Sequence, residues 1–214
     1  MAKNTDTLIA GLVDELEPVR LLEQRTGMAR AVLAVAAGAA IMAFGFGVRR
    51  DLADGRPDPM FLTSSGLFLV LALASAWAVI DMARPYVGTR REGWGWTALM
   101  AAVLPVSALG LAGIDWLRGI SVTLDRDGMT CLRLGIVIGL LTATTLVLWL
   151  RRGAPSSPKR AGLLTGVASG AAGIFAVSLY CPHSDLLHIG IWHGAAVIVM
   201  GLVGRAFLPR LLAW

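Results

Sequence analysis

Six long apolar stretches dominate this chain and decide what it can fold into. A membrane-spanning helix needs about 20 consecutive, mostly apolar residues, and six segments of the 214-residue sequence meet that requirement. They are 29–48, 60–83, 94–113, 132–150, 161–180 and 189–208. Charged residues make up only 15% of the chain, against about 25% in an ordinary soluble domain. The sequence therefore predicts an all-α, polytopic membrane protein built as a six-helix transmembrane bundle.

The connectors between these stretches are short and contain many residues that break helices. The segment 151–160, for example, reads Arg-Arg-Gly-Ala-Pro-Ser-Ser-Pro-Lys-Arg, which is typical of a turn-rich polar loop. No connector leaves room for a second globular domain. We therefore expect two parts, an N-terminal segment 1–28 and a six-span membrane domain 29–214.

The distribution of basic residues predicts the orientation of the bundle. Of the 19 Lys and Arg residues, 13 fall on the side of the predicted bundle that carries both termini, and 6 fall on the other side. Cytoplasmic loops are enriched in Lys and Arg, so both termini are predicted to be cytoplasmic. We attribute the net charge of +5 to this topology and to anionic lipid headgroups, and expect no direct contact with nucleic acid.

All cysteines and histidines map to the outer end of the last three predicted spans. We call this group the cysteine–histidine corner; it comprises Cys131, Cys181, His183, His188 and His193. Two cysteines are too few for a disulfide framework or a four-cysteine metal site. Three chemistries remain open: a reversible disulfide between the cysteines, binding of a thiophilic metal, or thiol oxidation by a peroxide or quinone.

A simpler interpretation is that the cysteines are small buried apolar residues and that His193 bonds a neighbouring helix. For a metal, the candidate ligands are Cys131, Cys181, His183 and His193, with a thiophilic divalent ion as signal and no resident cofactor required. On one α-helix, His188 and His193 would diverge by about 140°, because they are five residues apart.

Glycines at four-residue spacing recur in the three spans that carry this corner. The pairs and triplets are Gly135 and Gly139, then Gly162, Gly166 and Gly170, then Gly190 and Gly194. Small residues at this spacing let membrane helices approach through their backbones. Close packing of these helices is therefore expected.

The N-terminal segment predicts an acidic amphipathic helix. Its apolar residues recur at three- and four-residue spacing; they are Leu8, Ile9, Leu12, Val13 and Leu16. Helices that lie on membranes usually carry Lys and Arg on the polar face, whereas this one carries Asp14, Glu15 and Glu17. An acidic amphipathic helix better suits a protein groove with basic surroundings, such as a DNA-binding regulator provides.

Short motifs across the whole chain resemble those of one family. They are Leu8-Ile9 through Glu17-Pro18-Val19-Arg20, then Arg50-Asp51-Leu52, Cys131, Cys181-Pro182, Trp192-His193 and a closing Pro209-Arg210-Leu211-Leu212. In order and spacing the chain resembles the negative regulator of sigma F (NrsF) group of bacterial membrane anti-sigma factors. The resemblance implies a protein of the bacterial inner membrane that holds an extracytoplasmic-function sigma factor inactive at the membrane. It also implies that Cys131 and Cys181 take part in sensing heavy metals or oxidants.

The sequence thus favours an anti-sigma factor rather than an enzyme. The N-terminal helix would sequester the sigma factor, and a change at the two cysteines would release it. A membrane thiol oxidoreductase is a weaker alternative, because it would want a Cys-x-x-Cys pair. A metal transporter is weaker too, because the spans lack ionisable residues near their centres.

Overall fold

The computed structural model describes residues 2–15, 22–84, 94–118 and 127–212, and every regular element in this part of the chain is a helix. In chain order the α-helices are α1 (Ala2–Asp14), α2 (Gln24–Gly45), α3 (Arg50–Ala53), α4 (Pro59–Met82), α5 (Trp94–Leu117), α6 (Gly128–Leu150), α7 (Pro158–Ser178), α8 (Leu186–His188) and α9 (Gly194–Leu211). A π-helical turn, Ile189–His193, joins α8 to α9 without a break. The all-α prediction is confirmed.

Five of these helical segments are long and apolar enough to cross a membrane. They are α2, α4, α6, α7 and the continuous segment Leu186–Leu211 that holds α8, the π-helical turn and α9. Each matches a predicted span with ends shifted by a few residues. The chain is therefore a multi-pass membrane protein.

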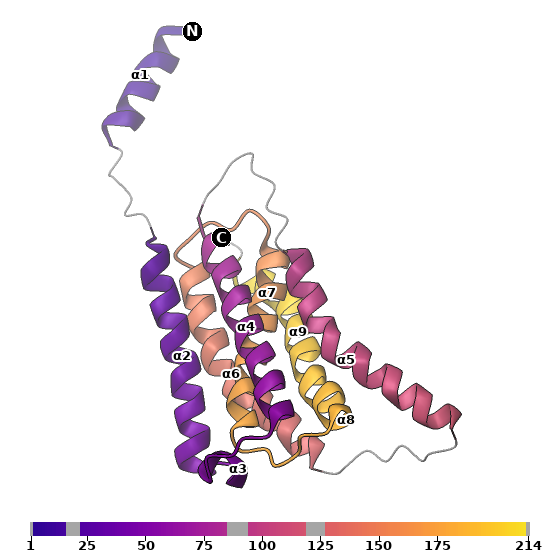
Figure 1. Cartoon of the computed structure of the whole chain (residues 1–214). Coiled ribbons are helices and arrows are strands. Elements are labelled where there is room, and N and C mark those ends of the chain that lie inside the picture. Colours follow the sequence, from indigo (N-terminus) through magenta and orange to yellow (C-terminus); the bar gives the residue numbers. More distant parts are fainter. Residues whose placement is uncertain (1, 16–21, 85–93, 119–126, 213–214) are drawn as a thin grey trace.

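The predicted count of six spans is not reproduced among the described residues. The difference is the third predicted span, 94–113, which lies within helix α5. Figure 1 shows α5 diverging from the other long helices towards its C-terminal end. Among the described residues, α5 is not counted with the five spans.

Helix α7 forms the centre of the bundle, between α4, α6 and α9 (Figure 1). Its sequence is rich in Gly, Ala and Ser, and almost all of its residues are buried. A Cβ atom at Gly166 would overlap the backbone of Met200 in α9, and one at Gly139 of α6 would overlap the backbone of Ser169. The expectation of close glycine packing is therefore confirmed for the predicted glycines of α6 and α7, whereas that for Gly190 and Gly194 stays a prediction.

The long helices begin and end at two common levels. At one end, a single buried cluster contains residues from the start of α2, the end of α4, the end of α6 and the start of α7: Ala31, Ala83, Leu150 and Ala161. Leu212, just past α9, packs in the same cluster. At the opposite end, the backbone N–H of Arg49 donates to the carbonyl of Leu179, 2.9 Å away, and links the α2–α4 connector to the end of α7.

Helix α1 stands apart from the bundle, on the side where α2 begins (Figure 1). Its side chains from Thr5 to Asp14 are all exposed. The rest of the predicted N-terminal segment divides between residues 16–21, which lie outside the described part, and the first turn of α2, which begins at Gln24 rather than at residue 29.

Candidate metal and thiol site

Four side chains of the cysteine–histidine corner converge at the end of the bundle far from α1. Cys131, Cys181, His188 and His193 each present one ligand atom, and these four atoms lie within 4.8 Å of one another. The Cys131 and Cys181 sulfurs are 3.5 Å apart, and Nε2 of His188 is 3.4 Å from the Cys181 sulfur. All four residues are at most 4% exposed. The expectation that this chemistry gathers at one end of the last helices is confirmed.

Tight packing of α6 against α7 brings the two cysteines together. Cys131 lies in the first turn of α6, and Cys181 follows the end of α7. A Cβ at Gly173 of α7 would overlap the carbonyl of Gly135 in α6, so the two backbones touch about one turn from Cys131 and two turns from Cys181. Met42 of α2 packs in the same buried cluster as both sulfur-bearing residues.

The expected divergence of His188 and His193 is wrong. Residues 189–193 form a π-helical turn, in which each N–H bonds the carbonyl five residues back. That turn has more residues than an α-helical one, so two side chains five apart return to nearly the same face. The His188 and His193 rings are in edge-to-face contact, with centroids 5.1 Å apart. Helical periodicity read from sequence assumes α-helix throughout, and the π-helical turn breaks that assumption.

His183 lies beside the buried group of four and is not one of its members. It stacks on His188, with ring centroids 4.6 Å apart. It also faces Asp127, whose carboxylate is 3.5 Å from the His183 Nε2. A second group of three potential ligands, His183, Asp185 and His188, lies at this more exposed level and shares His188 with the buried four. The structure thus brings His188, which was not among the predicted ligands, into the buried group with Cys131, Cys181 and His193.

The surroundings of Cys181 favour its thiolate. The contact with the Cys131 thiol, followed by those with His188 and His193, lowers the pKa of the Cys181 thiol, although burial opposes this effect. A thiolate, rather than a thiol, is the form that binds metals and reacts with oxidants. The two sulfurs are well beyond the ~2.05 Å of a disulfide bond, but they are near enough for either a disulfide or a shared metal ion.

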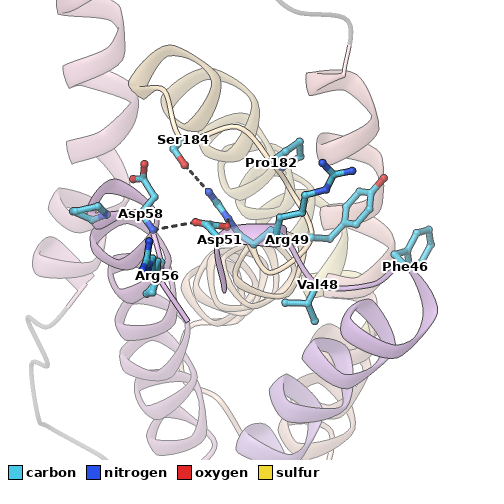
Figure 2. Close-up of a pocket in the computed structure, with 12 residues that line it drawn as sticks. Phe46, Val48, Arg49, Asp51, Arg56, Asp58, Pro182 and Ser184 are labelled. Atoms are coloured by element: carbon cyan, nitrogen blue, oxygen red, sulfur yellow. Dashed lines mark hydrogen bonds and ion pairs between the residues drawn. The ribbon is translucent and has the colours of Figure 1, made fainter. Parts of the chain in front are cut away.

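An ionic clasp beside this corner was not anticipated from the sequence. Arg49 is almost fully buried and pairs with Asp51, while its guanidinium donates to the Ser184 hydroxyl, 2.8 Å away (Figure 2). Asp51 also accepts from the backbone N–H of Asp58, and Arg49 together with this bond holds the pKa of the Asp51 carboxyl below its usual range. Arg49 thus ties the end of α2 to the segment that carries Cys181. In the sequence Arg49 resembles an ordinary interfacial charge, because Ser184 lies 135 residues away along the chain.

The predicted apolar side chains of the N-terminal helix lie on α1 and face solvent. Leu8, Ile9, Leu12 and Val13 are each more than half exposed. Leu16 lies outside the described residues. In a soluble helix this apolar face would normally be packed on a core, so it is available to a partner.

Comparison with known proteins identifies relatives over most of the chain. The family described as NrsF, negative regulator of sigma F, matches residues 12–214. The anti-sigma-F factor NrsF of Caulobacter vibrioides is 28% identical over 169 residues, which is 78% of each chain. The probable anti-sigma-F factor NrsF of Azospira oryzae is 26% identical over 170 residues, again 78% of each chain. No solved structure matches.

Proposed function

This chain belongs to the NrsF family of negative regulators of sigma F, a family of non-enzymatic regulators, and we propose that it is a membrane anti-sigma factor. Its partner in this proposal is an extracytoplasmic-function sigma factor. The names of both relatives support the class of partner, since each is described as an anti-sigma-F factor. The chain holds the sigma factor at the membrane and makes no contact with DNA itself.

The surface proposed to bind the sigma factor is the apolar face of α1. The observation that carries this proposal is the exposure of Leu8, Ile9, Leu12 and Val13 on a helix that is not packed on the bundle. An amphipathic helix of this kind binds by placing such residues in an apolar groove of a partner. Leu16 extends the same face in the sequence, and Asp14 and Glu15 provide acidic groups for a basic rim.

The proposed sensor is the cysteine–histidine corner, with Cys131 and Cys181 as the responding groups. In this proposal both termini are cytoplasmic, α5 completes a sixth span, and the corner faces the compartment outside the inner membrane. The charge distribution of the sequence supports that orientation, and α1 and the corner do lie at opposite ends of the bundle. A heavy metal or an oxidant acts on the thiols and weakens the grip of α1 on the sigma factor.

The binding half of this proposal is tested with the full chain in lipid nanodiscs. A purified extracytoplasmic-function sigma factor of the same organism is titrated against the intact chain and against a chain that lacks residues 2–15. The intact chain is expected to bind and the shortened chain to lose binding, while both keep the same helical circular-dichroism spectrum from the bundle. Equal binding by the two chains would contradict the assignment of α1.

A further inference from the structure

We propose that Cys131, Cys181, His188 and His193 form a closed, four-coordinate site for a thiophilic divalent cation of the Zn²⁺ class. The inference deepens the proposed function, since it names the ligand set and the coordination chemistry of the sensor. The proposed site requires His188 and His193, whereas a sensor built on the two cysteines alone would not. It also excludes His183 from the coordination sphere.

The distances between the side chains match those between ligands on one tetrahedral ion. With metal–sulfur bonds of about 2.3 Å and metal–nitrogen bonds of about 2.0–2.1 Å, tetrahedral geometry places two sulfurs about 3.8 Å apart and a sulfur and a nitrogen about 3.5 Å apart. The observed separations are 3.5 Å for the Cys131 and Cys181 sulfurs and 3.4 Å for the Cys181 sulfur and the His188 Nε2. The nitrogen of His193 lies within 4.8 Å of the other three ligand atoms. The two shorter separations differ from the tetrahedral values by a few tenths of an ångström or less.

The charge balance of the site also suits a divalent ion. Two thiolates and two neutral imidazoles carry a total charge of −2, so a bound divalent cation makes the buried site neutral. Buried charges are tolerated only when they are compensated. Each thiol that is protonated beforehand releases one proton on binding.

His193 contributes an independent observation. Its Nε2 atom is buried and has no hydrogen-bond partner among the described residues. Leaving a buried polar atom unsatisfied costs about 1–3 kcal/mol, and such atoms are rare in folded proteins. Coordination of an ion at this ring, or a hydrogen bond from the adjacent thiol in its place, would remove that cost.

The π-helical turn supplies the last part of the inference. Such turns are rare insertions in α-helices and are found frequently at functional sites. Here the turn 189–193 is the feature that places His188 beside His193 instead of on a different face of the helix. A regular α-helix would remove one histidine from the site.

The experiment uses the full chain in detergent or nanodiscs, with the thiols reduced and Co²⁺ as the probe. Tetrahedral Co²⁺ bound by thiolates gives a visible ligand-field band and a near-ultraviolet charge-transfer band. We expect one Co²⁺ per chain, with both bands, and displacement by one equivalent of Zn²⁺. His188→Gln and His193→Gln should each weaken binding by at least about 100-fold, because loss of a ligand exceeds the 10- to 100-fold effect of losing a ligand's hydrogen-bond partner.

His183→Gln is the matched control, because it removes an imidazole from the same loop but leaves the four ligands intact. It should bind Co²⁺ within about twofold of the unmodified chain, since it is not a ligand in this account. Full affinity in both the His188→Gln and the His193→Gln variants would overturn the site, and so would a loss of the spectrum in His183→Gln. An oxidised chain in which Cys131 and Cys181 form a disulfide should bind no Co²⁺.

Deleting Ile191 tests the π-helical turn while it keeps all four ligands. With one residue fewer, the turn returns to an α-helix in which the two histidines are four positions apart and again share a face, so the Co²⁺ spectrum should be kept. Loss of the spectrum in a folded chain would contradict the role given to the turn, which is to hold two histidines five residues apart on one face. The helical circular-dichroism spectrum and the thermal unfolding midpoint of the bundle serve as the folding controls for every variant. If Co²⁺ binds as described but leaves the affinity for the sigma factor unaltered, the sensing proposal fails and the metal site stands. If a metal or oxidant releases the sigma factor although the chain shows no Co²⁺ spectrum, the four-coordinate site fails and the sensing proposal stands.

Discussion

Helix α1 and the cysteine–histidine corner depart from the usual rules of burial in opposite directions. Helix α1 exposes large apolar side chains that have no core to cover them, whereas the corner buries two thiols and two imidazoles, and the Nε2 atom of His193 has no hydrogen-bond partner among the described residues. A protein partner that covers an exposed apolar face binds favourably, because apolar surface is removed from water. A ligand that bonds a buried polar cluster binds favourably, because it compensates groups that have lost their contact with water. Each end of the molecule therefore offers a surface or cluster that a further partner or ligand would complete, and the bundle lies between the two.

The largest expected effect concerns the apolar face of α1. In the double variant Leu8→Asp/Leu12→Asp, two carboxylates replace apolar contacts, and we expect sigma binding to weaken by about 100-fold or more, at roughly tenfold or more for each position. Isothermal titration or fluorescence anisotropy measures the affinity. Thr7→Asp adds a charge on the opposite side of the same helix and should change binding by less than about threefold if the apolar face alone makes the interface. Equal losses in the two variants would mean that charge, rather than the apolar face, governs binding.

The next effect concerns the packing of α7 against α9 in the bundle that lies between the two regions. Gly166→Val places a branched side chain against the backbone of Met200 in α9, and such overpacking costs about 1–3 kcal/mol or more. Thermal unfolding in detergent should therefore show a lower midpoint and less protein should accumulate in the membrane. Gly66→Ala, in α4, is the control, because no atom lies within 4 Å of the added Cβ. A Gly166→Val variant as stable as Gly66→Ala would refute the central packing of α7.

The thiols should affect response but not repression. In the double variant Cys131→Ser/Cys181→Ser, we expect release of sigma by metal or oxidant, about tenfold in apparent affinity for a coupling of ~1.4 kcal/mol, to disappear. Basal sigma binding should stay within about twofold, because α1 lies at the far end of the bundle. A reporter gene driven by the sigma factor measures both. Induction that survives in this variant would exclude the cysteines as sensors.

The smallest effect concerns the clasp that ties α2 to the Cys181 segment. Ser184→Ala removes the hydroxyl that accepts from Arg49, and loss of one such bond costs on the order of 1–2 kcal/mol. We expect a slightly lower unfolding midpoint and a weaker transmission of the metal signal. An unchanged response to metal would show that the signal does not pass through this contact.

The same clasp should depend on pH. The pKa of Asp51 is lowered in the folded chain by Arg49, so its contribution to stability is present above the ordinary carboxyl range and is lost as the pH falls through the folded-state pKa. Asp51→Asn should therefore destabilise the chain at neutral pH, and the difference from the unmodified chain should shrink in acid. A difference that is constant from neutral to acid pH would contradict the ionic character of the clasp.

Much of this architecture follows from the sequence, and the failures have physical causes. Apolar length sets helix length, so the ends of α4 and α7 fall within a few residues of their predictions. The gathering of Cys131 and Cys181 follows from counting spans. The proposed ligand role of His188 could not be predicted in this way, because the helical periodicity of the sequence does not show where a π-helical turn forms. The contact between Arg49 and Ser184 was missed for a related reason, because two residues 135 positions apart leave no local pattern in the sequence.

The most direct test of the whole account is the affinity of a purified sigma factor for the full chain in nanodiscs, measured with and without one equivalent of Zn²⁺ or Cd²⁺ under reducing conditions. The account predicts that the metal weakens sigma binding by about tenfold in the unmodified chain and has no effect in the Cys131→Ser variant. Identical affinities of the unmodified chain with and without the metal, in a sample shown to carry it, would contradict the claim that the corner controls α1.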